Sequence, residues 1–527
     1  MSLGPFQDSS PRLPAIAVIA LAALYLLAGV TAHDPWKSED AIHIAIAHGF
    51  ATHGNWLAPA VAGEFWPHTA PLYHWVAALS GRLLDGWLPF HDAARLATSF
   101  FGALFLIFLA GAARSFHGDA AARIAPLLAI GTLGLLVPIH EAQPAIAGLA
   151  CAALAWWGGG LSLQGRRLGA PLIGLGLGLS FLAHGLVGLI MALAVLPAPI
   201  LRRDGKGFLL ILLIALPLLA LWPALLLQHA PEFWTHWWQN EFAEATHARA
   251  LPEVKHFEQL VWAAWPVWPL ALWSLWLRRR ALDALLLFPL AGLALTLGWF
   301  LSGAPRTLAI LPLLLPLILV ASAGADRLRR GAANAFDWFG LMTFSFFAGL
   351  VWLGASALAL EWPPKIARNF DRLAPGFEPD YAPSVLALAL IVTLLWLFSL
   401  GLRRTGWRPV FRWAAGMTLL WVLTVALWLP WLDHGISYRP VALSLRAALP
   451  QDIDCIERGN LGPAQRASLD YFAGIRTAPA GRLQCSWRLG IAGQPRATPA
   501  GWSEVWRGGR PSDRKERWYL ERRLPAP

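Results

Sequence analysis

The sequence predicts an all-α polytopic membrane protein with a small C-terminal α/β domain, and three observations lead to this prediction. Of the 527 residues, 57% are hydrophobic and only 14% are charged. The apolar residues form blocks long enough to cross a bilayer, which takes about 20 residues in a helix. From about residue 440 onward the charges return and the apolar runs shorten. We therefore expect a transmembrane domain over residues 1–435 and an external soluble domain over residues 436–527.

The apolar blocks predict about thirteen transmembrane helices. Their expected ranges are 14–32, 95–112, 124–138, 145–163, 170–183, 185–201, 207–227, 259–277, 281–301, 307–324, 338–360, 384–402 and 413–431. The two segments that meet at His184 are also compatible with one long broken helix, and an even total would move the C-terminus to the other side. No cleavage site precedes the first segment, so we expect it to be retained as an anchor.

Basic residues concentrate in every second connection between these segments, as at Arg166-Arg167 and Arg202-Arg203. Basic loops lie on the cytoplasmic side, so the N-terminus is expected there and the C-terminal domain outside. The connections expected to face outward with that domain are residues 33–94, 228–258, 302–306 and 361–383. This bias accounts for most of the net charge of +11, so no nucleic-acid partner is expected.

The first external connection, residues 33–94, carries the candidate chemistry. Glu39 and Asp40 stand at the start of a stretch that fits a short interfacial helix. Carboxylates cost several kcal/mol in hydrocarbon, so an acidic pair at the membrane edge is a functional candidate. The alternative is a plain helix start, because acidic residues favour the first turn of a helix.

The layout of this connection resembles a known family. Glu39-Asp40 is followed by Gly-Asn-Trp-Leu-Ala-Pro at 54–59, by Gly63-Glu64, and by His-Thr-Ala-Pro-Leu-Tyr-His-Trp at 68–75. This order resembles the first external loop of the membrane glycosyltransferases that include lipid A aminoarabinose transferases and protein O-mannosyltransferases. The resemblance implies a GT-C fold. It also implies transfer of a sugar from a polyprenyl-phosphate donor to lipid A, another envelope glycan or a protein, at the outer face of the bacterial inner membrane.

The resemblance assigns Glu39 as the general base and Asp40 as its support. This chain inverts the family's Asp-Glu order, so Asp40 is the alternative base. The residues expected to bind the donor phosphate or the substrate are Lys37, His68, Tyr73, Glu141, His184 and Arg306.

The chain departs from the family pattern at three positions. Thr69 replaces a lysine expected near the donor phosphate, Ala145 replaces a second aspartate, and Ala309 replaces a tyrosine. These changes keep open a non-catalytic relative that binds a lipid-linked sugar or a partner protein. No cofactor is firmly expected, although a divalent metal held by His68 and Glu39 is a further possibility.

The C-terminal domain contains strand candidates near residues 450–456 and 485–491 and a helix candidate at 463–472. Cys455 and Cys485 lie on the two strand candidates. An external compartment permits a disulfide between them, and the alternative is a pair of free thiols. Cys151 lies within an apolar segment and is expected to be a small buried residue.

Overall fold

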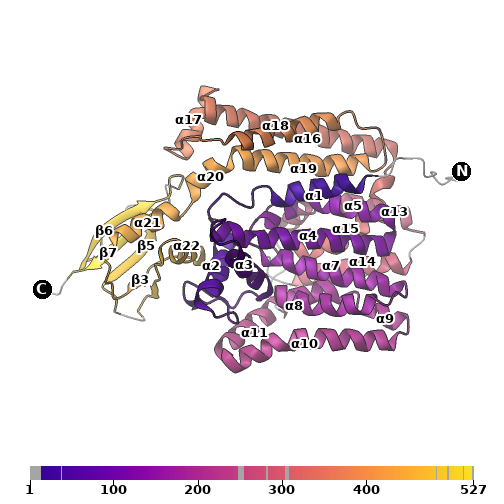
Figure 1. The fold of residues 1–527 in the computed structure, drawn as a ribbon, viewed down its shortest axis with the longest axis horizontal. Helices are drawn as coiled ribbons and strands as arrows, with labels where there is room; N and C mark the ends of the chain where they lie inside the picture. The colour runs from indigo at the N-terminus through magenta and orange to yellow at the C-terminus, as the bar shows by residue number, and fades with distance from the viewer. Residues whose placement is uncertain are drawn as a thin grey trace.

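The computed structural model describes residues 13–36, 38–246, 254–280, 283–302, 308–481, 484–494, 498–513 and 515–524. Most of these residues are helical, and the long helices run side by side in one bundle. A small mixed sheet lies at the end of the bundle opposite to the N-terminus (Figure 1). The observed architecture is therefore the predicted one, a helical membrane-type bundle with a C-terminal α/β unit.

The bundle consists of helices joined by short connections, apart from longer polar segments after α1, α10 and α16. They are α1 (Ala15–Leu27), α4 (Phe90–His117), α5 (Asp119–Ile130), α6 (Leu133–Leu136), the 3-10 helix η1 (Pro138–His140), α7 (Pro144–Leu163), α8 (Gly169–Leu193), α9 (Pro197–Leu201), α10 (Gly205–His229), α12 (Val254–Ala263), α13 (Val267–Arg278), α14 (Ala284–Ser302), α15 (Leu311–Ser322), η2 (Ala325–Arg327), α16 (Arg330–Leu360), α18 (Pro383–Ser399) and α19 (Arg408–Leu427).

Seven of the described helices are long and apolar enough to cross a membrane, or up to nine if each of two bent helix pairs is one span. The bent pairs are α5 with the following residues 133–140, at 69°, and the α12–α13 region, at 81°. Shorter apolar helices occur at Ala15–Leu27, Leu311–Ser322 and Pro383–Ser399. Each predicted apolar block thus contains a helix, and the total of thirteen spans stays a prediction.

Helix α8 is two antiparallel arms joined at a sharp turn. The backbone leaves helical geometry at His184 (φ −149°, ψ 29°) and at Gly185 (φ 57°, ψ −142°). A Cβ built on Gly188 would lie 2.0 Å from the carbonyl oxygen of Ser180, so the chain doubles back. Both ends of this segment, near Gly169 and near Val195, pack against the same end of α7. The structure therefore favours two segments meeting at His184 over one long broken helix.

Several shorter elements gather at the end of the bundle that carries the sheet (Figure 1). They are α2 (Ser38–His53), the strands β1 (Ala60–Val61) and β2 (Glu64–Phe65), α3 (Leu72–Leu83), α11 (Pro231–Thr246), α17 (Pro364–Leu373) and α20 (Leu429–Ile436). Except for α20, which joins the last predicted helix to the tail, these elements come from three of the four connections that the basic residues predict to face outward. The remaining predicted connection is residues 302–306, and residues 303–307 lie outside the described residues.

The C-terminal unit is a five-stranded sheet with two helices. Its helices are α21 (Arg439–Ala448) and α22 (Pro463–Ala473), and its strands are β3 (Ile456–Arg458), β4 (Ala478–Pro479), β5 (Trp487–Ala492), β6 (Trp502–Gly509) and β7 (Arg517–Arg523). The strand order is β4-β3-β5-β7-β6, in which β3 is parallel to β4 and β5 while β7 is antiparallel to both of its neighbours. Apolar residues of both helices pack on one face of the sheet, around Trp518 and Leu520.

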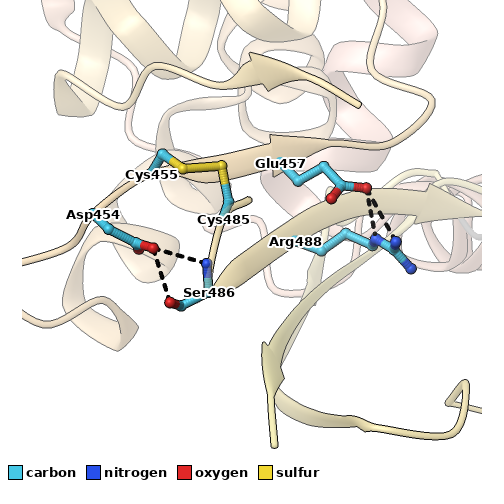
Figure 2. Close-up of a disulfide and its surroundings, with 6 residues drawn as sticks. All are labelled: Asp454, Cys455, Glu457, Cys485, Ser486 and Arg488. Atoms are coloured by element: carbon cyan, nitrogen blue, oxygen red, sulfur yellow. Dashed lines mark hydrogen bonds and ion pairs between the residues drawn. A yellow bond between two sulfur atoms is a disulfide. The ribbon is translucent and has the colours of Figure 1, made fainter. Parts of the chain in front are cut away.

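A disulfide joins Cys455, just before β3, to Cys485, just before β5. Figure 2 shows the bridge next to Asp454, whose side chain accepts hydrogen bonds from the backbone N–H and the hydroxyl of Ser486. The structure therefore contains the bridge that the sequence analysis expected. Cys151 is free and buried in α7.

Ion pairs and hydrogen bonds fasten this unit to the first polar connection. Glu64 on β2 accepts from Arg458 at 3.0 Å and from Arg466 at 2.5 Å. The Asp34 carboxylate accepts from the Ser437 hydroxyl at 2.6 Å and pairs with Arg439. The two ends of the chain therefore build one interface, and the first polar connection cannot keep these carboxylates paired without the C-terminal unit.

We expect replacement of Cys485 by serine to destabilise the C-terminal unit by roughly 3 to 4 kcal/mol, because the bridge closes a loop of 30 positions. Denaturant unfolding of the purified variant, with Cys151→Ala as the control, measures this loss. Thiol labelling of unreduced, denatured wild type should tag Cys151 alone. Labelling of all three cysteines would rule the bridge out.

The interface should also weaken as the pH rises. Burial, and then the charge of Asp34, raises the pKa of Asp433 to about 6. A carboxyl whose pKa is higher in the folded protein binds its proton more tightly when folded, so its stabilisation is lost as the pH passes upward through this value. After correction for the base-catalysed intrinsic exchange rate, the amide protection factors of α20 and α21 should be lower at about pH 7.5 than at about pH 5. Asp433→Asn should remove this difference, and an unchanged difference in the variant would contradict the assignment.

Candidate functional site

A cavity of about 120 Å³ lies at the sheet end of the bundle, where α1, α2, η1 and α19 meet α20. Its lining combines indole rings, aliphatic side chains and a few polar groups. The lining residues are Gly29, His33, Trp36, Asp40, His140, Glu141, Trp421, Thr424, Val425, Leu429 and Leu432. An apolar pocket with a few converging polar groups is the usual form of a small-molecule site.

The sequence places two carboxylates at this cavity through helix starts. Asp40 lies in the first turn of α2, where the helix dipole favours an acidic residue. Glu141 lies just before α7, which begins with Pro144 and is capped by the Gln143 side chain on the Ala145 N–H. These two helix starts bring an acidic residue of the first polar connection to one from the middle of the chain.

Asp40 is held in a buried ion pair with Arg95. The Arg95 Nε donates to Asp40 Oδ1 at 2.9 Å, and a terminal nitrogen of Arg95 donates to Oδ2 at 3.0 Å. The Ala142 N–H donates to Asp40 Oδ1 at 2.8 Å. Arg95 also donates to Asp92 Oδ1 at 3.0 Å. Asp40 is thus fully engaged in holding α2, α4 and the start of α7 together.

Charge and burial act in opposite directions on Asp40. Burial disfavours its ionised form, but the charge and hydrogen bonds of Arg95 outweigh that effect and lower the pKa of Asp40. Burial, and then the charge of Arg95, lowers the pKa of His33 to about 4, so this cavity residue is neutral at physiological pH. A carboxylate with a lowered pKa is a weak base, which makes Asp40 a poor proton acceptor.

Glu39 is the exposed member of the acidic pair, with 53% of its side chain accessible. Its Oε2 lies 3.3 Å from Nε2 of His43 one helical turn away. Nδ1 of His43 lies 3.0 Å from Nε2 of His74, and Nδ1 of His74 lies 3.2 Å from the Ala70 carbonyl oxygen. Glu39 therefore ends a line of hydrogen bonds that runs into the core.

The direction of these bonds follows from the last acceptor. A carbonyl only accepts, so His74 donates from Nδ1 to Ala70 and leaves its Nε2 to accept from His43. Burial, and then the neighbouring His43, lowers the pKa of His74 well below its usual range, so His74 is neutral. Nε2 of His43 then faces the Glu39 carboxylate, 3.3 Å from its Oε2.

The donor-phosphate candidates do not converge in the described residues. Tyr73 is fully buried, and its hydroxyl donates to Thr98 at 2.8 Å, which in turn donates to the Glu141 backbone carbonyl. Tyr73 therefore helps to position the Glu141 backbone through Thr98. His68 is exposed and contacts the Trp66 ring edge-on at 4.8 Å. Lys37 and Arg306 lie outside the described residues.

His184 lies at the turn between the two arms of α8, beside α11. The Glu241 carboxylate on α11 accepts from the Leu186 N–H at 2.8 Å, and Asn240 donates to the Pro67 carbonyl at 3.0 Å. The α8 turn, α11 and the residues before His68 are therefore neighbours. This neighbourhood is distinct from the cavity lined by Asp40 and Glu141.

The metal expectation finds no support in the described part of the chain, where no three His, Cys, Asp or Glu side chains are placed to hold an ion. Glu39 is instead hydrogen-bonded to His43. At the altered motif positions, Thr69, Ala145 and Ala309 are all buried. Thr69 donates to the Ala70 carbonyl at 3.3 Å, so its hydroxyl is turned to the backbone.

Sequence reasoning missed several cavity residues. Arg95 could have been linked to Asp40, because a lone arginine in an apolar helix requires a buried acidic partner. Trp421 gave no comparable signal. Its ring stacks on His140 with centroids 4.2 Å apart, across a separation of 281 residues that no local pattern reveals.

The structure has a polar site at one end of an apolar helical bundle, between the first connection and a C-terminal sheet. This is a membrane protein with the GT-C glycosyltransferase fold. Two crystal structures of ArnT from Cupriavidus metallidurans share this arrangement. The one bound to undecaprenyl phosphate has a TM-score of 0.70 at 18% identity, over 96% of this chain and 97% of that chain. The apo form has a TM-score of 0.65 at 19% identity, over 89% and 85% of the two chains.

At these identities the likeness establishes the fold alone. No protein-family model matches the sequence, and no curated protein matches it. The fold expected from the first polar connection is therefore confirmed by structure rather than by sequence.

The buried pair gives a direct stability prediction. Arg95→Met leaves Asp40 buried without its counter-charge and should cost roughly 3 to 5 kcal/mol. Melting temperature and the yield of monodisperse protein measure the loss. Glu39→Gln serves as the control, because that side chain is exposed, and it should leave both values close to wild type. Equal behaviour of the two variants would contradict the structural role of Arg95.

Proposed function

We propose that this protein is a glycosyltransferase that moves a sugar from a polyprenyl-phosphate donor to an acceptor in the bacterial envelope. The observation that carries the proposal is the division of labour between the two adjacent carboxylates. Asp40 is buried and saturated by Arg95, whereas Glu39 is exposed and backed by His43. The GT-C fold and the undecaprenyl phosphate bound to the ArnT structure support a lipid-linked donor.

The reaction requires a base at the acceptor hydroxyl. The acceptor oxygen attacks the anomeric carbon of the sugar, the bond from that carbon to the phosphate oxygen breaks, and polyprenyl phosphate leaves with the bonding electrons. The acceptor proton passes to the Glu39 carboxylate. His43, whose Nε2 lies 3.3 Å from Oε2 of Glu39, holds this carboxylate in place during the transfer.

The cavity is suited to one sugar ring. Its volume of about 120 Å³ is of the order that accommodates a single six-membered ring. Trp36 and Trp421 offer flat apolar faces, and Glu141 and neutral His33 offer hydrogen-bonding groups for hydroxyls. His184 and His68, in the neighbourhood of α11, remain our candidates for contact with the donor phosphate.

We place this site at the outer face of the inner membrane, with the N-terminus cytoplasmic. The basic connections predict this orientation. The elements around the cavity lie at the opposite end of the bundle from the N-terminus (Figure 1). A polyprenyl chain cannot leave the bilayer, so a site at the membrane edge is where its phosphate is accessible to a water-borne acceptor. Lipid A, another envelope glycan and a protein are the acceptor classes that we propose.

Substitution of Glu39 tests the proposal. Glu39→Gln should lower transfer by about two to four powers of ten, as expected for a lost general base, while donor binding is kept. The assay incubates purified protein with radiolabelled polyprenyl-phosphate sugars and an envelope extract, and follows label into any acceptor. Asp119→Asn is the control, because its exposed carboxylate pairs with Arg114 between α4 and α5, and neither residue lines the cavity or docks the C-terminal unit.

Two outcomes would contradict this assignment. Wild-type protein that binds the donor but transfers no label favours the non-catalytic relative. Transfer that survives Glu39→Gln but is lost in Glu141→Gln would assign the general base to Glu141.

A further inference from the structure

The positive charge of this protein is concentrated in the C-terminal unit. Residues 436–527 contain 15 Lys or Arg and 8 Asp or Glu, so they carry seven of the eleven net positive charges. This corrects the attribution of the net charge to cytoplasmic connections. Residues 33–94 contain 2 basic and 6 acidic residues, so their net charge is opposite in sign to that of the unit that docks on them. An excess of positive charge remains on a part of the protein where the cytoplasmic bias does not apply.

Docking and internal pairs use only some of these basic residues. Arg439 pairs with Asp34, and Arg458 and Arg466 pair with Glu64. Pairs within the unit engage Arg476, Arg488, Arg507 and Arg510. Among the described residues, no ion pair forms at the exposed side chains of Lys515, Arg517 and Arg523.

The sheet register places two of these residues, Arg517 and Arg523, on one face, whereas Arg522, which is also exposed and makes no ion pair among the described residues, lies on the other face over the Trp487 ring. Trp518 and Leu520 of β7 point to the helices α21 and α22, so Arg517, Tyr519 and Arg523 point to the opposite face. Arg507 lies opposite Tyr519, and Trp502 lies opposite Arg523. Arg488, which Figure 2 shows paired with Glu457, lies opposite Glu521 on the same face. We call these residues the open sheet face.

Aromatic rings lie among the arginines of the open sheet face. The Arg488 guanidinium lies 4.5 Å from the centre of the Trp502 ring. A small hollow on this face is lined by Arg507, Arg517 and Tyr519 together with Glu504 and Glu521, so two carboxylates lie among the basic groups. Arginine binds phosphate and carboxylate groups through two parallel hydrogen bonds, and aromatic rings pack against the apolar faces of sugars.

The position of this face indicates what kind of anion it meets. β6 and β7 lie at the far end of the molecule from the N-terminus, beyond α2 and α3 along its longest axis (Figure 1). Lipid headgroups would lie beside the bundle. An anion that reaches β6 and β7 has to project from the membrane or come from the aqueous side.

We propose that the open sheet face binds the anionic glycan portion of the acceptor, a carbohydrate that carries phosphate or carboxylate groups. Its identity as the acceptor rests on the proposed function, whereas glycan binding by this face does not. The excess of positive charge attracts the polyanion, and Arg517 and Arg523, free of internal ion pairs, contact its acidic groups. The docked C-terminal unit thereby holds the acceptor on the same molecule as the cavity.

Binding of a fluorescent sulfated glycan such as heparin to the full-length protein in neutral-lipid nanodiscs tests this proposal. Arg517→Glu and Arg523→Glu should each weaken binding by roughly three- to tenfold at low ionic strength, because each reversal turns an attraction into a repulsion. Arg446→Glu is the matched control. It makes the same charge change at an exposed residue of α21, on the helix side of the sheet, and should alter binding less than about twofold.

Three results would overturn the proposal. They are equal weakening by Arg446→Glu, no binding of heparin beyond that of neutral dextran, and binding to vesicles of anionic phospholipid without binding to heparin. Glu39→Gln should bind heparin like wild type. If the wild-type protein transfers sugar but does not bind heparin, this inference alone fails. If the wild-type protein binds heparin but does not transfer sugar, the result bears on the proposed function alone.

Discussion

The ion pair between Asp40 and Arg95 is the interaction on which the site depends. It joins α2 to α4, and through the Ala142 N–H it fixes the chain that leads from Glu141 into α7. A buried pair of this kind is costly to desolvate, so it contributes geometry more than net stability. Because Asp40 is committed to this task, its neighbour Glu39 is directed away from Arg95 toward His43. Two adjacent carboxylates thus acquire different chemistry from their surroundings.

The cavity is assembled from distant parts of the sequence. Its wall contains Gly29 at the end of α1, His140 from the middle of the chain and Trp421 from α19. Mostly apolar walls lower the local dielectric, which strengthens the action of the few polar groups that remain. Burial, and then the charge of Arg95, lowers the pKa of His33 and keeps it neutral, whereas Arg95 lowers the pKa of Asp40 against the effect of burial and keeps it ionised.

The fold could be predicted from the sequence because apolar blocks and basic connections are local signals. The first polar connection was predicted to carry the site for the same reason, since Glu39 and Asp40 are adjacent, and this stays a prediction. Their roles were not predictable, because the choice between them depends on Arg95, which lies 55 positions from Asp40. Tyr73 illustrates the opposite error: its motif position suggested substrate contact, whereas tertiary packing buries its hydroxyl on Thr98. Local sequence patterns predicted which segment carries the candidate site, whereas long-range contacts determine which of its side chains are buried and which are exposed.

The interface between Glu64 and the pair Arg458 and Arg466 has a consequence for biosynthesis. About 400 residues separate the two sides of this contact, and α22, which carries Arg466, is among the last elements to leave the ribosome. The Glu64 carboxylate of the first polar connection therefore stays hydrated while the bundle inserts, because Arg458 and Arg466 are not yet available to pair with it. The polar end of the bundle therefore reaches its final form only after the C-terminal unit has folded against it.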